Sequence, residues 1–336
     1  MTARRRRWAV PTYVGLVAVA ALALAAPGLV ERYAWLPLLL SLPLLGMAHG
    51  AVDHRVPQRL LGRPLGRRRL ALLIGAYAIV SVVLMGLWWV APVLALGLFL
   101  AVAALHWGDG DLWFCETVNG RAAPRSAVSL AAFVLARGLL PIALPVLADP
   151  GSALPAFDVI VGLFGHDEPL VLAPAVRVAG LAAVAVVTAA AALLSLRDNA
   201  GRPRAAALTD IGELALLAAF FALTPAVFAV GAYFLLWHSP RHILRLIDAE
   251  PTQRALLDAG RDGAALVAFH REALLFTVVP LIGIALIAVA LAATGASEIA
   301  AVSLAAIAAL TYPHAAVVAW MDHRQGVWGA ALRSRA

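Results

Sequence analysis

Long apolar runs alternate with short polar segments along nearly the whole chain. Ten such runs are present, each close to the roughly 20 residues that a membrane-spanning helix needs. They are rich in Ala, Leu and Val and show no period-two alternation, which favours helices over strands. The runs lie near residues 8–28, 34–52, 70–90, 92–114, 126–148, 170–195, 206–224, 226–247, 273–293 and 298–321.

The composition is typical of an integral membrane protein. Of 336 residues, 63% are hydrophobic and only 13% are charged, whereas soluble domains are about half apolar and about a quarter charged. We therefore predict an all-α, polytopic integral membrane protein, with residues 1–336 forming a single domain. It would have about ten transmembrane helices, or eight if the turns at Pro92 and Pro225 break long helices instead of forming hairpins.

The net charge of +7 could indicate nucleic-acid binding, but the basic residues lie at the ends of the apolar runs. Loops rich in Arg alternate with loops poor in it, such as the long segment 149–169 and the short segment 293–298. The positive-inside rule then places both termini in the cytoplasm, in a multi-pass protein of the cell (plasma or inner) membrane, with no nucleic-acid partner. A single cysteine, Cys115, excludes an intrachain disulfide and a cysteine-based metal site.

Five of the nine histidines lie late in four runs that cross the membrane in the same direction. These are His49, His106, His238, His242 and His314, in the runs 34–52, 92–114, 226–247 and 298–321. Ionisable residues inside a membrane are rare and mark functional sites. We therefore predict a metal site near the cytoplasmic ends of these four helices. Counted from the first charged residues, His314 lies about one turn deeper than the others, and His54 reads as a solvated imidazole at a helix end.

The stretch WHSPRH places His238 and His242 four residues apart, so both lie on one helix face and can share a metal ion. Pro240 between them either kinks the helix or marks a new helix with Ser239 as N-cap. An all-imidazole ligand set suits Fe(II) with an open position for O2, and the residues alone leave copper and zinc open.

Acidic neighbours supply candidates for orienting the ligands. Asp53 follows His49 by four residues, Asp109 follows His106, and Glu213 lies deepest among the acids at the start of the run 206–224. A carboxylate that accepts a hydrogen bond from a ligating imidazole fixes its orientation. Arg137, near the middle of the run 126–148, has no evident partner.

Four stretches, GMAHGAVDHRV, LHWGDGD, LLWHSPRH and YPHAAVVAWMD, resemble the Brp/Blh family of membrane-bound β-carotene cleavage enzymes. They span residues 46–322. The resemblance implies a dioxygenase that uses Fe(2+) and O2 to split β-carotene at its central 15,15′ double bond, giving two retinal molecules for a rhodopsin. It assigns the iron to His49, His106, His238 and His242, and His314 matches a further family histidine that is a possible fifth ligand.

Four aromatic residues flank these motifs and are candidates for lining a tunnel for the polyene: Trp107, Tyr233, Trp237 and Tyr312. An aromatic belt at the membrane interface explains each of them equally well.

Two other functions remain open. HGAVDH approaches a pattern of transition-metal transporters, but a transporter needs ligands through the full bilayer depth. Another membrane metal-dependent oxidase of carotenoids or lipids would share the histidine layer.

Overall fold

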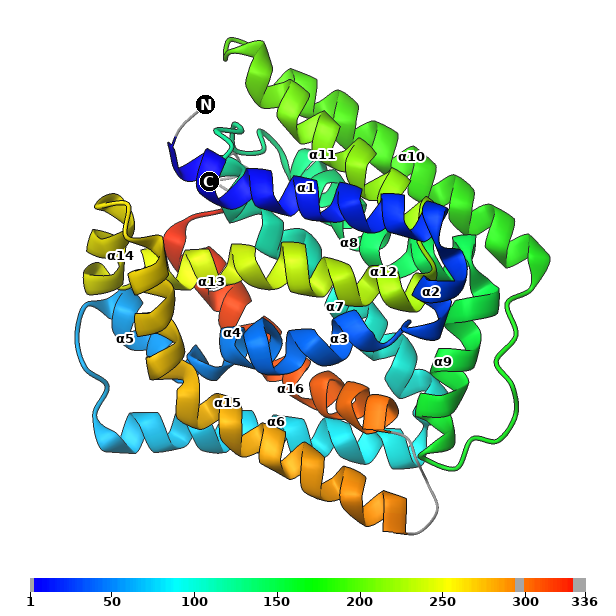
Figure 1. The fold of residues 1–336 in the computed structure, drawn as a ribbon. Coiled ribbons are helices and arrows are strands. Elements are labelled where there is room, and N and C mark those ends of the chain that lie inside the picture. The colour runs from blue at the N-terminus through cyan, green and yellow to red at the C-terminus, as the bar shows by residue number, and fades with distance from the viewer. Residues whose placement is uncertain (1–2, 294–298, 329–336) are drawn as a thin grey trace.

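The computed structural model describes residues 3–293 and 299–328, which form helices joined by turns and loops and contain no strand (Figure 1). The elements, including three short π or 3-10 turns labelled η, are α1 (Ala3–Ala25), α2 (Pro27–Arg32), α3 (Leu36–Ser41), η1 (Leu42–Gly46), α4 (Met47–Ala51), η2 (Asp53–Arg55), α5 (Val56–Leu61), α6 (Arg67–Val90), α7 (Pro92–Thr117), α8 (Ala127–Ala148), α9 (Pro150–Gly162), α10 (Pro174–Asp198), α11 (Arg204–Leu223), α12 (Ala226–Tyr233), η3 (Phe234–His238), α13 (Ser239–Asp248), α14 (Pro251–Asp258), α15 (Asp262–Ala293) and α16 (Ile299–Gln325).

Within the described residues, nine helical segments are long and apolar enough to cross a membrane. They correspond to nine of the ten predicted spans, and the all-α, multi-pass architecture is confirmed. The remaining predicted span, 226–247, is helical from Ala226 to Asp248 through α12, η3 and α13. This segment is not among the nine. Its second half carries two histidines and two arginines among its apolar residues, which makes it less apolar than the other spans.

Both proline turns separate helices. Ala91 leaves helical geometry between α6 and α7 (φ −151°, ψ 72°), and α6 packs against α7. Thr224 (φ −114°, ψ 134°) does the same between α11 and α12, which also pack together. The chain therefore folds back at both positions, as hairpins require.

Two predicted loops need correction. The segment 149–169 contains α9, which Asp149 caps by accepting a hydrogen bond from the Ser152 N–H at 3.3 Å. The run predicted at 273–293 begins earlier, because α15 starts at Asp262 and its first turns carry His270 and Arg271 on a continuous helix. Most of the predicted short loop 293–298 lies outside the described residues.

One π-helical turn, η1, precedes His49, and another, η3, ends at His238. In η1 the Met47 N–H bonds the Leu42 carbonyl, and in η3 the Ser239 N–H bonds the Phe234 carbonyl. Pro43 lies within η1 and Pro240 follows η3 by two residues, and neither has an N–H for the regular ladder. Such local widening is typical of functional sites because it redirects the residues that follow.

A glycine allows the two π turns to meet. A Cβ atom on Gly46 would lie 2.7 Å from the Phe234 ring, too close for any other residue without displacement. Of the two alternatives for Pro240, the helix continues: His238 (φ −65°, ψ −57°) and Ser239 (φ −63°, ψ −44°) keep helical geometry, so no new helix starts there and Ser239 is not an N-cap. Ser239 is the first residue of α13 and its buried hydroxyl has no partner among the described residues.

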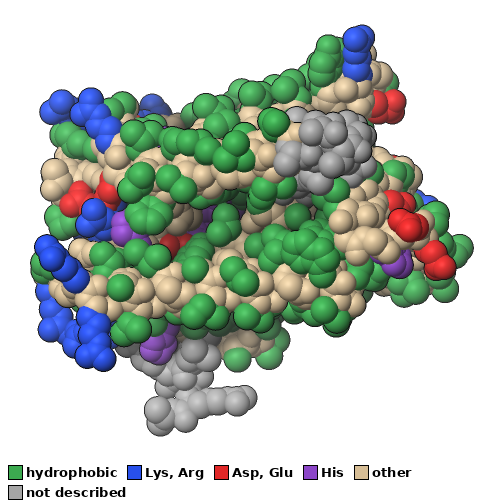
Figure 2. Space-filling model, turned by 90° about the horizontal axis from the view of Figure 1, so that it is seen from below, with side chains coloured by type: hydrophobic (Ala, Val, Ile, Leu, Met, Phe, Trp, Pro, Cys, Tyr) green, Lys and Arg blue, Asp and Glu red, His purple; other side chains and the backbone are tan. Residues whose placement is uncertain are grey.

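The beginning of α1 and the end of α16 lie at the same end of the bundle (Figure 1). Arg4 there pairs with Asp248 at 2.8 Å and Asp258 at 3.1 Å, tying α1 to the α13–α14 corner. All basic residues of the chain are arginines, and most of those seen in Figure 2 lie at one end of the face that it shows. This distribution agrees with the positive-inside rule, and the cytoplasmic orientation of both termini stays a prediction.

Candidate metal centre

The five histidines predicted to converge do lie together inside the bundle. Their ring centroids are 4.8 Å apart for His49–His314 and His106–His314, 5.1 Å for His106–His238, and 5.2 Å for His242–His314. The side chains come from α4, α7, η3, α13 and α16, and all five are buried. One cluster is therefore assembled from segments that are far apart in the sequence.

His314 belongs to the cluster itself. The prediction that it lies one turn deeper is wrong, because its ring packs directly against those of His49, His106 and His242. One ring nitrogen from each of His49, His106 and His314 lies within 4.8 Å of the other two. That separation is comparable with twice a metal–nitrogen bond of about 2 Å.

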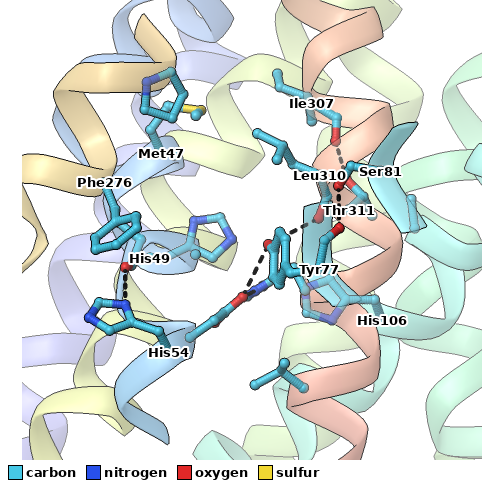
Figure 3. Close-up of a pocket in the computed structure, with 18 of the residues that line it drawn as sticks. Met47, His49, His54, Tyr77, Ser81, His106, Phe276, Ile307, Leu310 and Thr311 are labelled. Atoms are coloured by element: carbon cyan, nitrogen blue, oxygen red, sulfur yellow. Dashed lines mark hydrogen bonds and ion pairs between the residues drawn. The ribbon is translucent and has the colours of Figure 1, made fainter. Parts of the chain in front are cut away.

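Asp53 orients His314, not His49 as its sequence spacing indicates. The His314 Nδ1 donates to the Asp53 Oδ2 at 2.8 Å, and the Tyr77 hydroxyl donates to the same oxygen at 3.3 Å (Figure 3). Since Nδ1 carries the proton, the Nε2 lone pair of His314 remains free within the cluster. The His49 Nδ1 instead lies 3.3 Å from the Leu45 carbonyl.

Several of these imidazole nitrogens are buried without a hydrogen-bond partner in the described part of the chain: the Nε2 atoms of His106, His238 and His314, and both ring nitrogens of His242. A buried polar atom left unpaired costs about 1–3 kcal/mol. Lone pairs that converge in this way suit a metal ion, which binds neutral imidazole. The donor set therefore fits a first-row transition metal and offers no thiolate or carboxylate to it.

An apolar cavity of about 440 Å³ lies beside the cluster. His49, His106, His238 and His314 form part of its wall, and α6, α15 and α16 supply most of the remaining lining. Figure 2 shows a hollow on the face formed by these helices, with histidine and acidic side chains visible between apolar ones. His54 is half-buried in this wall beside Phe276, at 4.4 Å between ring centroids, and is not a solvated imidazole.

Of the four aromatic residues proposed as tunnel lining, Trp107 lines this cavity. Its ring lies 5.3 Å from that of His238 and stacks on Phe234 at 5.9 Å. Tyr233, Trp237 and Tyr312 are absent from the cavity walls found among the described residues. Tyr233 and Trp237 are fully buried and stack on each other, so they act as packing behind the cluster.

Arg137 has the partners that the sequence does not reveal. Its guanidinium bonds Asp111 at 2.7 Å, Asp210 at 2.6 Å and Glu213 at 2.8 Å, and it is fully buried. Arg241, between His238 and His242 in the chain, pairs with Asp111 at 3.0 Å and Glu213 at 2.6 Å. This ion-pair network holds α13 against α7 and α11.

Two acids predicted to orient the ligands have other partners. Glu213 belongs to the ion-pair network and bonds Arg137, Arg241, Tyr13 and Asn119. Asp109 accepts from the Trp328 indole at 2.6 Å, so neither carboxylate bonds a clustered histidine. Asp111, Cys115 and Glu213 also lie close enough to hold an ion. Their two carboxylates already face guanidinium groups, which makes this group a poor cation site.

Arg241 and Tyr77 were missed by the sequence interpretation. A charged residue inside the WHSPRH stretch was a usable signal, because an intramembrane arginine needs partners. Tyr77 gave no signal, since one tyrosine in an apolar helix is ordinary. It reaches Asp53 because α6 packs across α16, and its hydroxyl also donates to the Leu310 carbonyl at 3.2 Å.

Residues 40–322 match the model of the β-carotene 15,15′-dioxygenase family, a stretch that contains all five clustered histidines. The chain belongs to this family. The "probable beta-carotene 15,15'-dioxygenase Blh" of Halobacterium salinarum is 35% identical, and the alignment covers 97% of each chain. The "probable beta-carotene 15,15'-dioxygenase Brp" of the same species is 27% identical, over 86% of this chain and 84% of the relative. No solved structure matches significantly.

Membership in the β-carotene 15,15′-dioxygenase family agrees with the site's construction. The site combines a buried all-histidine donor set with an apolar cavity inside a multi-pass membrane protein. Such a site can hold a metal ion next to a space for a substrate that dissolves in the bilayer.

Proposed function

We propose that this protein cleaves β-carotene at its central 15,15′ double bond with O2, producing two molecules of all-trans-retinal. The central carbon–carbon double bond and the oxygen–oxygen bond are both broken, and two aldehyde carbonyl bonds form. Each oxygen atom enters one product, so no external reductant is needed. The observation that supports this most strongly is the convergence of five buried histidines on the wall of an apolar cavity.

We propose Fe(2+) as the metal, held by His49, His106, His238 and His242, with His314 as a further ligand. Iron would supply the redox chemistry that allows O2 to react with an alkene. The chain's own contribution is to present unprotonated ring nitrogens in a buried layer. Asp53 fixes the tautomer and orientation of His314, and the Arg241 network fixes the helix that carries His238 and His242.

The cavity suits a hydrocarbon substrate. β-Carotene is a rigid polyene about as long as the bilayer's hydrocarbon core, about 30 Å, and it dissolves among lipid tails. Leu73 and Ile74 of α6 and Phe276 of α15 line the cavity, and Figure 2 shows a hollow on the face that these helices form. A carotene can enter there directly from the membrane, without passing through water. Aromatic faces such as Trp107 can then stack on the conjugated chain.

The membrane in question is proposed to be the plasma (inner) membrane, where both substrate and a retinal-binding rhodopsin would reside. The product is the chromophore that such a partner needs.

Purified protein loaded with Fe(2+) in detergent is expected to convert β-carotene to retinal when O2 is present. Chromatography would show about two retinal molecules for each β-carotene lost, and no product under nitrogen. Products of unequal chain length would contradict central cleavage. Metal uptake by vesicles without any aldehyde would instead favour a transporter.

Asp53→Asn is expected to lower metal affinity by about tenfold to hundredfold, which is typical when a carboxylate partner of a ligating histidine is lost. The asparagine amide can still face His314, but it carries no charge, so the charge-assisted hydrogen bond is lost. Competition with a coloured chelator would measure the change. The matched control is Asp109→Asn, because Asp109 bonds Trp328 away from the cluster and should leave affinity unchanged. Equal effects of the two changes would contradict the orienting role of Asp53.

A further inference from the structure

A second cavity, of about 110 Å³, adjoins the first. Both walls contain Phe99, Ala103, Trp107, Phe234 and Ile307, so the two spaces meet at these side chains. Ala103 precedes His106 by three residues and Phe234 precedes His238 by four, one helical turn or about 5.4 Å. The second cavity, which we call the inner chamber, therefore begins about one turn from the histidine rings.

The wall of the inner chamber consists mostly of large apolar side chains, and small and proline side chains lie among them on α8 and α9. Pro141 and Pro145 lie on one face of α8, and Ala153 and Ala156 lie on α9, which covers the chamber. Proline inside a helix removes a backbone hydrogen bond and bends the helix, which opens space. The chamber is apolar and begins about one turn from the histidine rings, so its position suits an apolar occupant.

The chemistry of the wall identifies that occupant. The lining contains no hydroxyl, amide or charged side chain in the described residues, and its only polar side-chain atoms are indole nitrogens. In contrast, the first cavity carries Tyr77, Ser81 and Thr311 in addition to the histidines. A substrate cut at its midpoint must extend equally to both sides of the reacting bond. The first cavity opens toward the lipid, so the second half of the molecule needs a separate apolar space.

We propose that the inner chamber holds one ring end group of β-carotene while the central double bond lies beside the histidine cluster. This assignment rests on the proposed function. Trp107 and Phe234, whose rings stack at 5.9 Å, flank the polyene where it passes from one cavity to the other. Ala153 and Ala156 set the depth available to the ring.

The test fills the chamber from α9. Ala153→Phe places an aromatic ring where the substrate's ring would lie, because Ala153 is only 3% exposed and lines the chamber. Retinal formation is measured with β-carotene and with γ-carotene, in which one ring is replaced by a slimmer open chain. We expect kcat/KM for β-carotene to fall at least about tenfold, and the ratio of γ-carotene to β-carotene cleavage to rise several-fold. Bound iron should remain at the wild-type level.

Val159→Phe is the matched control, since Val159 lies on the same helix with 39% exposure and outside the chamber wall. It should change neither substrate's rate. Ala156→Leu adds less volume than Ala153→Phe and should shift the substrate ratio in the same direction, which guards against misfolding of the larger variant. An unchanged ratio in both chamber variants would overturn the assignment. Wild-type protein that cleaves neither carotene would overturn the proposed function itself, and the chamber assignment would fall with it.

Discussion

His242→Ala is expected to remove most bound iron and to reduce retinal formation to background. Both ring nitrogens of His242 are buried and have no hydrogen-bond partner in the part of the chain that the structure describes, and its ring lies 5.5 Å from His49 and 5.2 Å from His314. Losing a ligand should exceed the tenfold to hundredfold effect of losing a ligand's hydrogen-bond partner. The same result is expected for His49, His106 and His238. Iron content and product formation are measured on the same preparations.

His323→Ala provides the control, because His323 is exposed near the end of α16 and should keep full iron and activity. The variants should still insert and fold, since apolar helices with internal hydrogen bonds make up the structure. His314→Ala should also lose iron, because its ring is in contact with three other histidines. Full iron and full activity in both His238→Ala and His242→Ala would refute the metal centre.

Arg137→Leu is expected to destabilise the protein by about 3–5 kcal/mol, the usual cost of removing one member of a buried ion pair. Asp111, Asp210 and Glu213 would then keep their charges in a dry interior with fewer partners. Thermal unfolding in detergent would show a lower midpoint. Arg197→Leu is the control, because Arg197 is 54% exposed and lies 3.9 Å from Asp198, so about 1 kcal/mol or less is expected. Equal midpoints for the two variants would show that the buried network contributes little.

The histidine cluster could be predicted because helices crossing in the same direction place their late residues at one depth. Counting from the first charged residue places His314 deeper than His106 because Asp109 follows His106 after only three residues. Asp109 and Asp111 instead lie within α7, where side chains from other elements satisfy them. His106 lies eleven residues before Thr117, the last residue of α7. His314 likewise lies eleven residues before Gln325, the last residue of α16.

Pairings between distant helices could not be predicted from one sequence. Arg137 needs acids from α7 and α11, and nothing in the apolar pattern of α8 indicates which ones. The inner chamber depends in the same way on α9, whose sequence reads as a loop because two prolines, Pro150 and Pro155, and Gly151 interrupt it. Pro150 in fact begins that helix, where its missing N–H has no partner to lose. Asp53 shows that spacing along one helix does not determine which histidine a carboxylate orients.

X-ray absorption spectroscopy of the iron-loaded wild-type protein would show directly whether the clustered imidazoles hold the iron. We expect a first shell dominated by nitrogen, with the outer-shell scattering of several imidazole rings, and fewer rings in any iron retained by His242→Ala. A first shell of carboxylate oxygen or sulfur without imidazole scattering, or a spectrum unchanged in that variant, would contradict it.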